Sequence, residues 1–213
     1  MATIKTGDLY THYHVDRADE RRGLFQLLAE EYGCTTGLYP GCFVHVTPSF
    51  YLPSMIYADS DDNAARFFAG GYAQMIIARE KTYDAAQLVE FHHQDYGKPL
   101  PVNQESVDLL ISQYAGPVSA ACGKYLESGG VLVANNSHAD AGIAGTDPSF
   151  ELVAVVKKRG TAFSMSTEDL DAYLTPKSTS VPTDREELRT YLMERGSGVR
   201  YAKSASHYIF RKR

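Results

Sequence analysis

The sequence predicts an α/β protein whose mostly parallel sheet is covered by helices on both faces. Two observations predict this fold: short apolar runs of strand length recur along the chain, and segments with a helical pattern lie between many of them. Such alternation is typical of a three-layer parallel sheet. The chain has 213 residues, 44% of them hydrophobic and 22% charged. This composition is that of a folded domain with a sizeable core.

The first predicted element is an amphipathic helix over residues 17–32. Asp16 stands where a helix N-cap is expected, and Gly33 is a typical residue at a helix C-terminus. The predicted apolar stripe of this helix consists of Leu24, Phe25, Leu27 and Leu28.

Seven apolar runs are predicted to be strands, since turn signals or helical patterns separate them. The first ends at Pro40-Gly41 and the second at the acidic cluster of residues 59–62. In chain order the runs are residues 35–39, 55–58, 87–91, 107–112, 131–134, 152–156 and 207–210.

Four further segments have helical patterns: residues 63–68, 73–81, 118–126 and 184–194. For the last, Thr183 or Asp184 is the expected cap, and two glutamates in the first turn suit the helix dipole. The Pro-, Ser- and Thr-rich segment 175–183 is expected to be an exposed loop.

The net charge of −5 excludes a strongly basic nucleic-acid coat. Residues 1–150 carry 9 basic and 18 acidic side chains. Residues 151–213 carry 12 basic and 8 acidic side chains and end in Arg211-Lys212-Arg213. A basic end either contacts an anionic partner such as RNA or forms a solvated surface, and the second interpretation is favoured.

The chain is expected to be cytoplasmic, without membrane contact. Residues 1–10 lack the features of a secretory signal, and the longest apolar runs are too short to cross a bilayer. Three cysteines without CxxC spacing fit free thiols in a reducing compartment. The sequence does not predict an oligomeric state.

Four motifs in order resemble class I S-adenosylmethionine-dependent methyltransferases. The first strand ends in a glycine turn (LYPGC, residues 38–42), and the second ends in an acid, Asp59, eighteen residues after Gly41. The segment ESVDLLIS (105–112) resembles the S-F-D-x-v strand of the family, and YLESGGVLV (125–133) resembles its L-x-p-G-G-x-l turn between a helix and the fifth strand. The resemblance covers about residues 17–213.

The resemblance implies a Rossmann-like methyltransferase sheet, mostly parallel, with a C-terminal antiparallel hairpin. It implies a single domain over residues 1–213, in which residues 1–33 form a helical extension. Residues 34–150 would then be the cofactor-binding half, and residues 151–213 the C-terminal strand–helix–strand half.

The glycine loop departs from the family pattern D-x-G-x-G-x-G. Only Gly37 and Gly41 are present, Tyr39-Pro40 replaces the acid, and Phe43 would narrow the approach to a cofactor. The chain is therefore predicted to be a divergent member. The alternative is a non-catalytic or nucleotide-binding protein that keeps the fold. A dinucleotide-dependent oxidoreductase is disfavoured because G-x-G-x-x-G is absent.

The resemblance implies that S-adenosylmethionine contacts Tyr39, Gly41, Asp59, Ser60, Asp95 and Gln113. Asp59 stands where a carboxylate accepts both ribose hydroxyls, or else it caps the next helix, with Asp61 as a competitor. Asp95 stands where the family places an acid or amide near the adenine amine, or else it is a turn residue beside Gly97.

Methyl transfer from a sulfonium depends mainly on positioning, so the candidate catalytic residues follow the fourth strand, at residues 112–115. Tyr114 would border the methyl site. This loop lacks the N/D-P-P-Y motif of amino-methylating relatives, which leaves a base or nucleic-acid amine unsupported. No accessory domain for a macromolecule is recognised in the sequence, which favours a small-molecule substrate or one supplied by a protein. His138, after the fifth strand, is a candidate general base, although a polar loop histidine is the commoner case.

Three groups of residues suggest metal ligands: His12 with His14, His92 with His93, and His138 with Asp140. Their spacing does not suit a zinc site, so no metal is predicted. Cys42 beside the glycine turn has His45 as a conceivable partner for a reactive thiol, but a small buried residue is the favoured interpretation.

Overall fold

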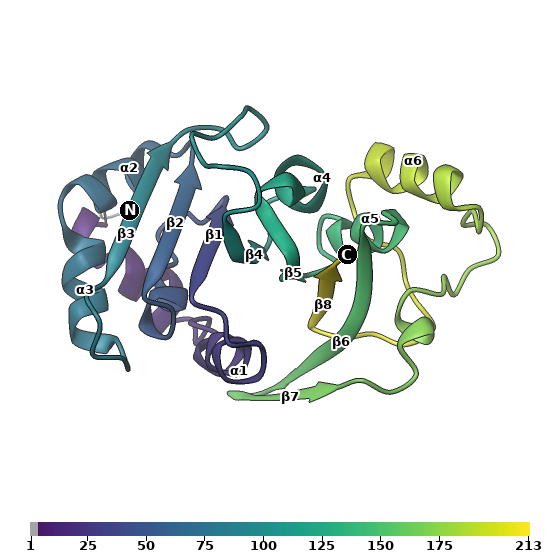
Figure 1. Ribbon diagram of the computed structural model, residues 1–213, viewed down its shortest axis with the longest axis horizontal. Coiled ribbons are helices and arrows are strands. Elements are labelled where there is room, and N and C mark those ends of the chain that lie inside the picture. The colour runs from purple at the N-terminus through teal and green to yellow at the C-terminus, as the bar shows by residue number, and fades with distance from the viewer. Residues whose placement is uncertain (1–3) are drawn as a thin grey trace. The chain divides into compact units, whose positions relative to one another are not determined.

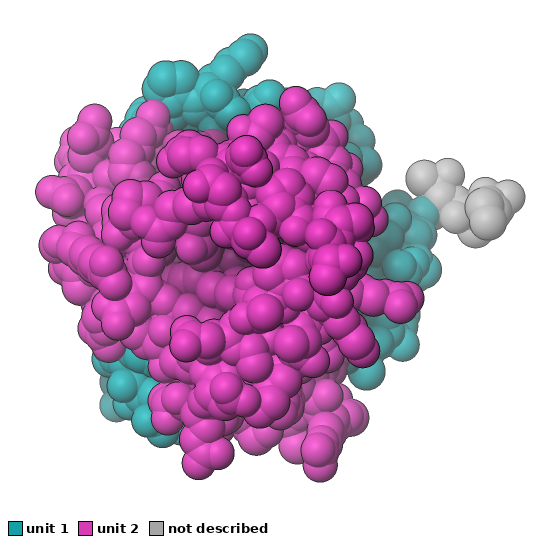
Figure 2. Space-filling view, turned by 90° about the vertical axis from the view of Figure 1, so that its right-hand side faces the viewer, with its two compact units in different colours: residues 1–101 teal, residues 102–213 magenta. Residues whose placement is uncertain are grey.

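The computed structural model describes residues 4–213, which form two compact units: unit 1 ends at Pro101, and unit 2 spans residues 102–213. Figure 2 shows unit 1 in teal and unit 2 in magenta. The residues of the predicted N-terminal extension before residue 4 lie outside the described part. The expected single domain and its internal boundaries at residues 33 and 150 remain predictions.

Unit 1 contains a three-stranded parallel sheet in the order β3-β2-β1 (Figure 1). The strands are β1 (Thr36–Pro40), β2 (Ser54–Asp59) and β3 (Leu88–His93), and each bound lies within two residues of the predicted one. Tyr39 of β1 is in register with Tyr57 of β2. The sheet forms here because these runs combine β-branched, aromatic and other apolar residues bounded by Pro, Gly or Asp.

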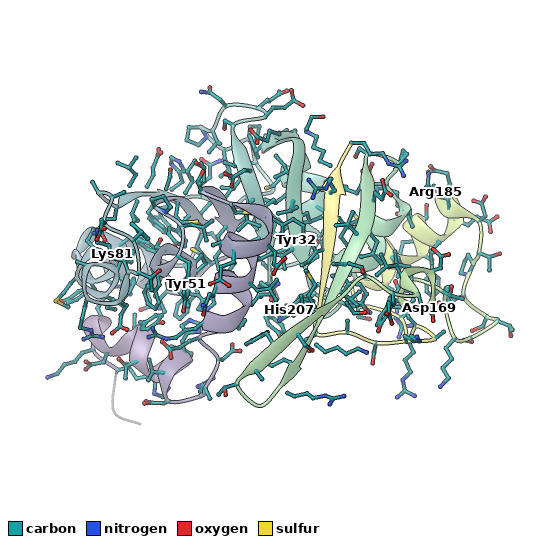
Figure 3. The ribbon with its side chains drawn as sticks, turned by 60° about the horizontal axis from the view of Figure 1, so that its bottom comes forward. Tyr32, Tyr51, Lys81, Asp169, Arg185 and His207 are labelled. Carbon is teal, nitrogen blue, oxygen red and sulfur yellow. The ribbon has the colours of Figure 1, made fainter. Side chains whose placement is uncertain are left out.

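The helices of unit 1 are α1 (Arg22–Tyr32), α2 (Asp62–Ala69) and α3 (Tyr72–Glu80). Tyr32 at the end of α1 and Lys81 after α3 are labelled in Figure 3. A π-helical turn, Thr11–Val15, and two 3-10 turns, Thr6–Asp8 and Thr47–Phe50, complete the unit.

The first helix is shorter than predicted, because it begins at Arg22 rather than at residue 17. Ala18 and Arg21 have φ angles of 50° and 54°, which interrupt a helix, and the Arg21 guanidinium pairs with Asp19 at 2.6 Å. The prediction that Asp16 caps α1 was therefore wrong; Asp16 follows the π-helical turn instead. Gly33 ends α1 at φ 65°, as predicted.

Unit 2 contains five strands in the order β4-β5-β8-β6-β7, of which β4 and β5 are parallel and the other pairs antiparallel. They are β4 (Val107–Ser112), β5 (Leu126–Ala134), β6 (Phe150–Arg159), β7 (Ala162–Ser166) and β8 (His207–Lys212). His207, at the start of β8, is labelled in Figure 3. Strand β7 was not predicted, because its sequence AFSMS is short and half polar.

The helices of unit 2 are α4 (Val118–Cys122), α5 (Asp140–Thr146) and α6 (Arg185–Arg195), with 3-10 turns at Gly123–Tyr125 and Leu170–Tyr173. Asp184 caps α6 by accepting hydrogen bonds from the backbone N–H groups of Glu186 and Glu187, which selects it over Thr183. Helix α5 escaped prediction because it has only seven residues, two of them glycines.

The predicted helix over residues 118–126 is too long, because Leu126 already belongs to β5. The glycine pair expected to precede this strand lies within it: Gly129 has φ 85°, and the pairing of β5 with β4 shifts register between Val107 and Leu109. In the segment expected to be an exposed loop, Val181 is buried among the residues that hold α5 and α6 together. Over residues 4–213, no helix has the length and apolar character that crossing a membrane requires.

Candidate functional site

The turn after β1 contains two residues with left-handed backbone conformations, Gly41 and Phe43. Gly41 has φ 65°, and its N–H donates to the carbonyl of Ala58 at 2.7 Å. Two residues on, Phe43 has φ 48°. A residue with a Cβ pays roughly 1–2 kcal/mol for that region, so the turn holds Phe43 in a conformation that glycine adopts freely.

The carboxylate of Asp59, at the end of β2, holds this turn. Its Oδ2 accepts the backbone N–H of Phe43 at 2.7 Å, and its Oδ1 accepts the N–H of Asp61 at 2.8 Å. Asp61 is the cap of α2, since it accepts from the N–H groups of Asn63 and Ala64. The alternative role of Asp59 as a helix cap was therefore wrong. Each Asp59 oxygen retains further acceptor capacity.

The N-terminal segment of unit 1 lies against the same turn. The ring of Tyr13 meets that of Phe43 edge to face, with centroids 5.1 Å apart. The rings of His14 and His45 are in tilted contact with centroids 4.3 Å apart, and the hydroxyl of Tyr10 lies 2.9 Å from Oγ1 of Thr47. Side-chain contacts thus connect the segment before α1 to both ends of the loop that follows β1.

Cys42 and His45 do not form a reactive pair. The buried thiol of Cys42 contacts the carbonyl of Phe43, and burial raises the pKa of this thiol well above its usual value. Both ring nitrogens of His45 have other partners, the hydroxyl of Tyr39 at 3.2 Å and the carbonyl of Glu20 at 3.0 Å. The interpretation of Cys42 as a small buried residue fits these contacts.

The remaining predicted cofactor residues of unit 1 differ in accessibility. The side chain of Tyr39 is buried, and its hydroxyl lies 3.2 Å from Nδ1 of His45. Ser60 is exposed, and its carbonyl lies 3.1 Å from Nε2 of His93. Asp95 is exposed and accepts the N–H of Gly97 at 2.8 Å, the geometry of the turn residue considered above. The structure thus groups Gly41, Asp59 and Ser60, and leaves Asp95 in a separate turn.

The predicted residues of unit 2 follow β4 and β5. Gln113 is buried, with Oε1 3.5 Å from Nδ2 of Asn135 at the end of β5. Tyr114 is 58% exposed and has φ 59°. His138 lies in an exposed turn after β5. The assignment of all the predicted site residues remains a prediction.

Asp140 has a role that the sequence analysis missed. Its carboxylate is 1% exposed and accepts the hydroxyl of Ser112 at 2.5 Å, the backbone N–H of Ser119 at 3.0 Å and the hydroxyl of Ser119. Ser112 ends β4 and Ser119 lies in the first turn of α4. Asp140 therefore closes the loop that carries Gln113 and Tyr114.

The histidines considered as metal ligands are separated by these contacts. The buried ring of His14 lies against that of His45, and Nε2 of His92 lies 3.1 Å from Glu90 on its own strand. Across residues 4–213, no group of three or more His, Cys, Asp or Glu side chains could hold a metal ion.

Comparison with solved structures identifies the fold. A candidate O-methyltransferase from Klebsiella pneumoniae is 10% identical and superposes with a TM-score of 0.51, over 78% of this chain and 89% of that one. An O-methyltransferase from Bacillus cereus, in complex with S-adenosylhomocysteine, is 11% identical with a TM-score of 0.47, over 78% and 90%. No protein-family model matches the sequence, and neither does any curated protein.

The chain has the Rossmann-like α/β fold of class I methyltransferases. The first of these superpositions and the strand arrangement within each unit confirm the predicted fold class, including the antiparallel C-terminal strands. The low sequence identity is consistent with a divergent sequence on this fold.

Proposed function

We propose that this chain is an S-adenosylmethionine-dependent methyltransferase. The observation that carries the proposal is the position of Asp59, at the carboxyl end of β2 and bonded to the turn after β1. In open α/β sheets, ligands bind at the carboxyl ends of the strands. The superposition on a candidate O-methyltransferase from Klebsiella pneumoniae supports this class of reaction.

The residues of the turn suit such a cofactor. The Asp59 carboxylate, already oriented by two N–H groups, has acceptor capacity for the ribose hydroxyls. Gly41 lacks a Cβ where the methionine part would pass. The cofactor supplies a methyl group activated on a sulfonium. Gln113 and Tyr114 are proposed to border the position of that methyl group, and His138 is the candidate base if the acceptor must lose a proton.

The proposed acceptor is a small molecule rather than RNA. The three basic residues at the C-terminus have intramolecular partners: Arg211 donates to the carbonyl of Gly129, Lys212 to that of Leu126, and Arg213 to Glu151. These contacts favour the interpretation of the basic end as a structural surface. They leave its side chains less available for phosphates.

A second candidate, a nucleotide-binding protein without methyl transfer, is favoured by one observation. Phe43 occupies a left-handed position two residues after Gly41, where the family pattern has a glycine. Its Cβ narrows the approach to the backbone amides. This candidate predicts binding of adenosine or ATP with no preference for S-adenosylhomocysteine.

Calorimetric titration with S-adenosylhomocysteine tests the proposal. We expect micromolar binding that Asp59→Ala weakens at least about tenfold, because two charge-assisted hydrogen bonds to ribose are lost. Asp61→Ala is the matched control, since it removes a carboxylate two residues away that caps α2. It should leave the affinity within about twofold while lowering stability by about 1 kcal/mol. The absence of binding to the folded wild-type chain would reject the proposal, and equal affinity for ATP would favour the second candidate.

A further inference from the structure

Strand β3 is the free edge of the sheet in unit 1, because it pairs only with β2 among the described residues. The N–H of Leu88 donates to Pro53, and the N–H of Gln94 donates to Asp59, so the even-numbered residues of the strand bond inward. In a parallel pair every second residue faces the partner. The backbone N–H and C=O groups of Val89, Phe91 and His93 therefore point away from the sheet.

The same three residues line a groove on the helix-covered face of the strand. The groove has a volume of about 310 Å³, and its other wall consists of α2 and of Gln74 from α3. The Phe91 ring stacks on Phe68 at 4.3 Å, which forms a flat apolar floor. The amide oxygen of Gln74 is buried without a hydrogen-bond partner. A donor from a docked segment would satisfy it.

The opposite face of β3 carries a carboxylate beside an imidazole. Glu90 is exposed and lies 3.1 Å from Nε2 of His92, which precedes the more exposed His93. Leu88 is 65% exposed at the start of the strand. The strand contains no proline, lysine or bulge, three of the features that prevent an edge from pairing.

We propose that β3 is an interface with a second copy of this chain, in which the two strands pair antiparallel about Phe91. This register places Phe91 opposite its counterpart and Val89 opposite His93, so all the outward-facing backbone groups pair, in about six hydrogen bonds. It also places Glu90 of each copy opposite His92 of the other. The Glu90 carboxylate of each copy thus faces the His92 imidazole of the other, and this self-complementary pattern selects a second copy as the occupant.

Sedimentation velocity of the full chain over a concentration series tests this interface. We expect a dimer whose dissociation constant rises about tenfold or more in His92→Glu. This substitution places a glutamate opposite Glu90 of the other copy at both ends of the symmetric pairing, and like charges repel there. The double variant Glu90→Lys with His92→Glu restores opposite charges and should return the constant to within about threefold of wild type. Glu127→Lys, an exposed change on β5, is the control and should have no effect.

A backbone substitution tests the hydrogen-bond ladder independently. Val89→Pro removes one outward N–H per chain, which an edge strand tolerates, and should convert the dimer to a monomer. Thermal unfolding confirms that each variant folds. If Val89→Pro does not fold, the dissociation constants of the charge variants alone decide whether β3 is the interface. A wild-type chain that stays monomeric throughout the series overturns the proposal. The proposal is also overturned if Val89→Pro and His92→Glu both fold and both dimerise with the wild-type dissociation constant, because the dimer would then use another surface.

Discussion

Asp140→Ala is expected to lower the free energy of unfolding by about 3 kcal/mol at pH 7, because it leaves buried donors of Ser112 and Ser119 without an acceptor. Asp140→Asn keeps one acceptor oxygen and should cost less. The measurement is urea denaturation followed by circular dichroism. Ser137→Ala, in the exposed turn before α5, is a control that should change stability by less than about 1 kcal/mol.

The loop that Asp140 closes should loosen in the same variant. Limited proteolysis is expected to cut the segment 113–117 faster in Asp140→Ala than in wild type at equal folded fraction. An alanine variant as stable as wild type, with an unchanged cleavage pattern, would contradict the role assigned to this carboxylate.

Acid is expected to destabilise unit 1 through its buried histidines. Burial, and then the charge of Arg21, lowers the pKa of His14 to about 4, and the same causes hold the pKa of His45 well below its usual value. Each imidazole is neutral when folded but takes up a proton near pH 6.5 when unfolded. The stabilisation is therefore present above pH 6.5 and is lost as pH falls toward 4.

For His14 alone this linkage amounts to about 2.5 kcal/mol between pH 7.5 and pH 4.5. His14→Phe keeps an aromatic ring against Tyr10 and His45 but does not titrate, so it should lose correspondingly less stability on acidification. His12→Phe, two residues earlier and outside this contact, should behave as wild type does. Urea denaturation at the two pH values provides the comparison.

The buried carboxyl group of Asp140 has a pKa shift whose effect on the pH dependence of stability is opposite to that of His14. Burial raises the pKa of Asp140, so its contribution to stability is greatest at acid pH and declines as pH rises through its folded-state pKa. A loss of stability in acid cannot then arise from Asp140. Equal acid sensitivity of His14→Phe and wild type would show that His14 does not carry the effect.

Periodicity was sufficient to predict most of the sheet, because strands such as β4 are apolar runs with sharp polar borders. Prediction was wrong where local signals conflicted with tertiary contacts. The helix predicted from residue 17 starts at Arg22, since the Asp19–Arg21 pair and two positive φ angles shape the preceding turn. Strand β7 is stabilised by pairing with β6, which its own composition does not reveal.

The position of Asp59 at a strand end was predictable, because an acid directly follows an apolar run; its role in the site stays a prediction. The contacts that give such residues their roles are long-range and leave no periodic signal. Asp140 attracted attention only as a metal ligand, although it binds serines 21 and 28 residues away. Likewise the rings of His14 and His45 are in contact across 31 positions of sequence. An acid just before a short apolar run was the only local sign of α5 and its buried carboxylate.

The most direct test of the proposed cofactor site is a crystal structure of the full chain grown with S-adenosylhomocysteine. We expect the ribose hydroxyls to lie within hydrogen-bond distance of the Asp59 carboxylate and the homocysteine part to pass Gly41. A well-defined ligand whose ribose lies away from Asp59 would contradict the proposed site. So would the absence of bound ligand at saturating concentration, in crystals where Asp59 and the turn after β1 are accessible.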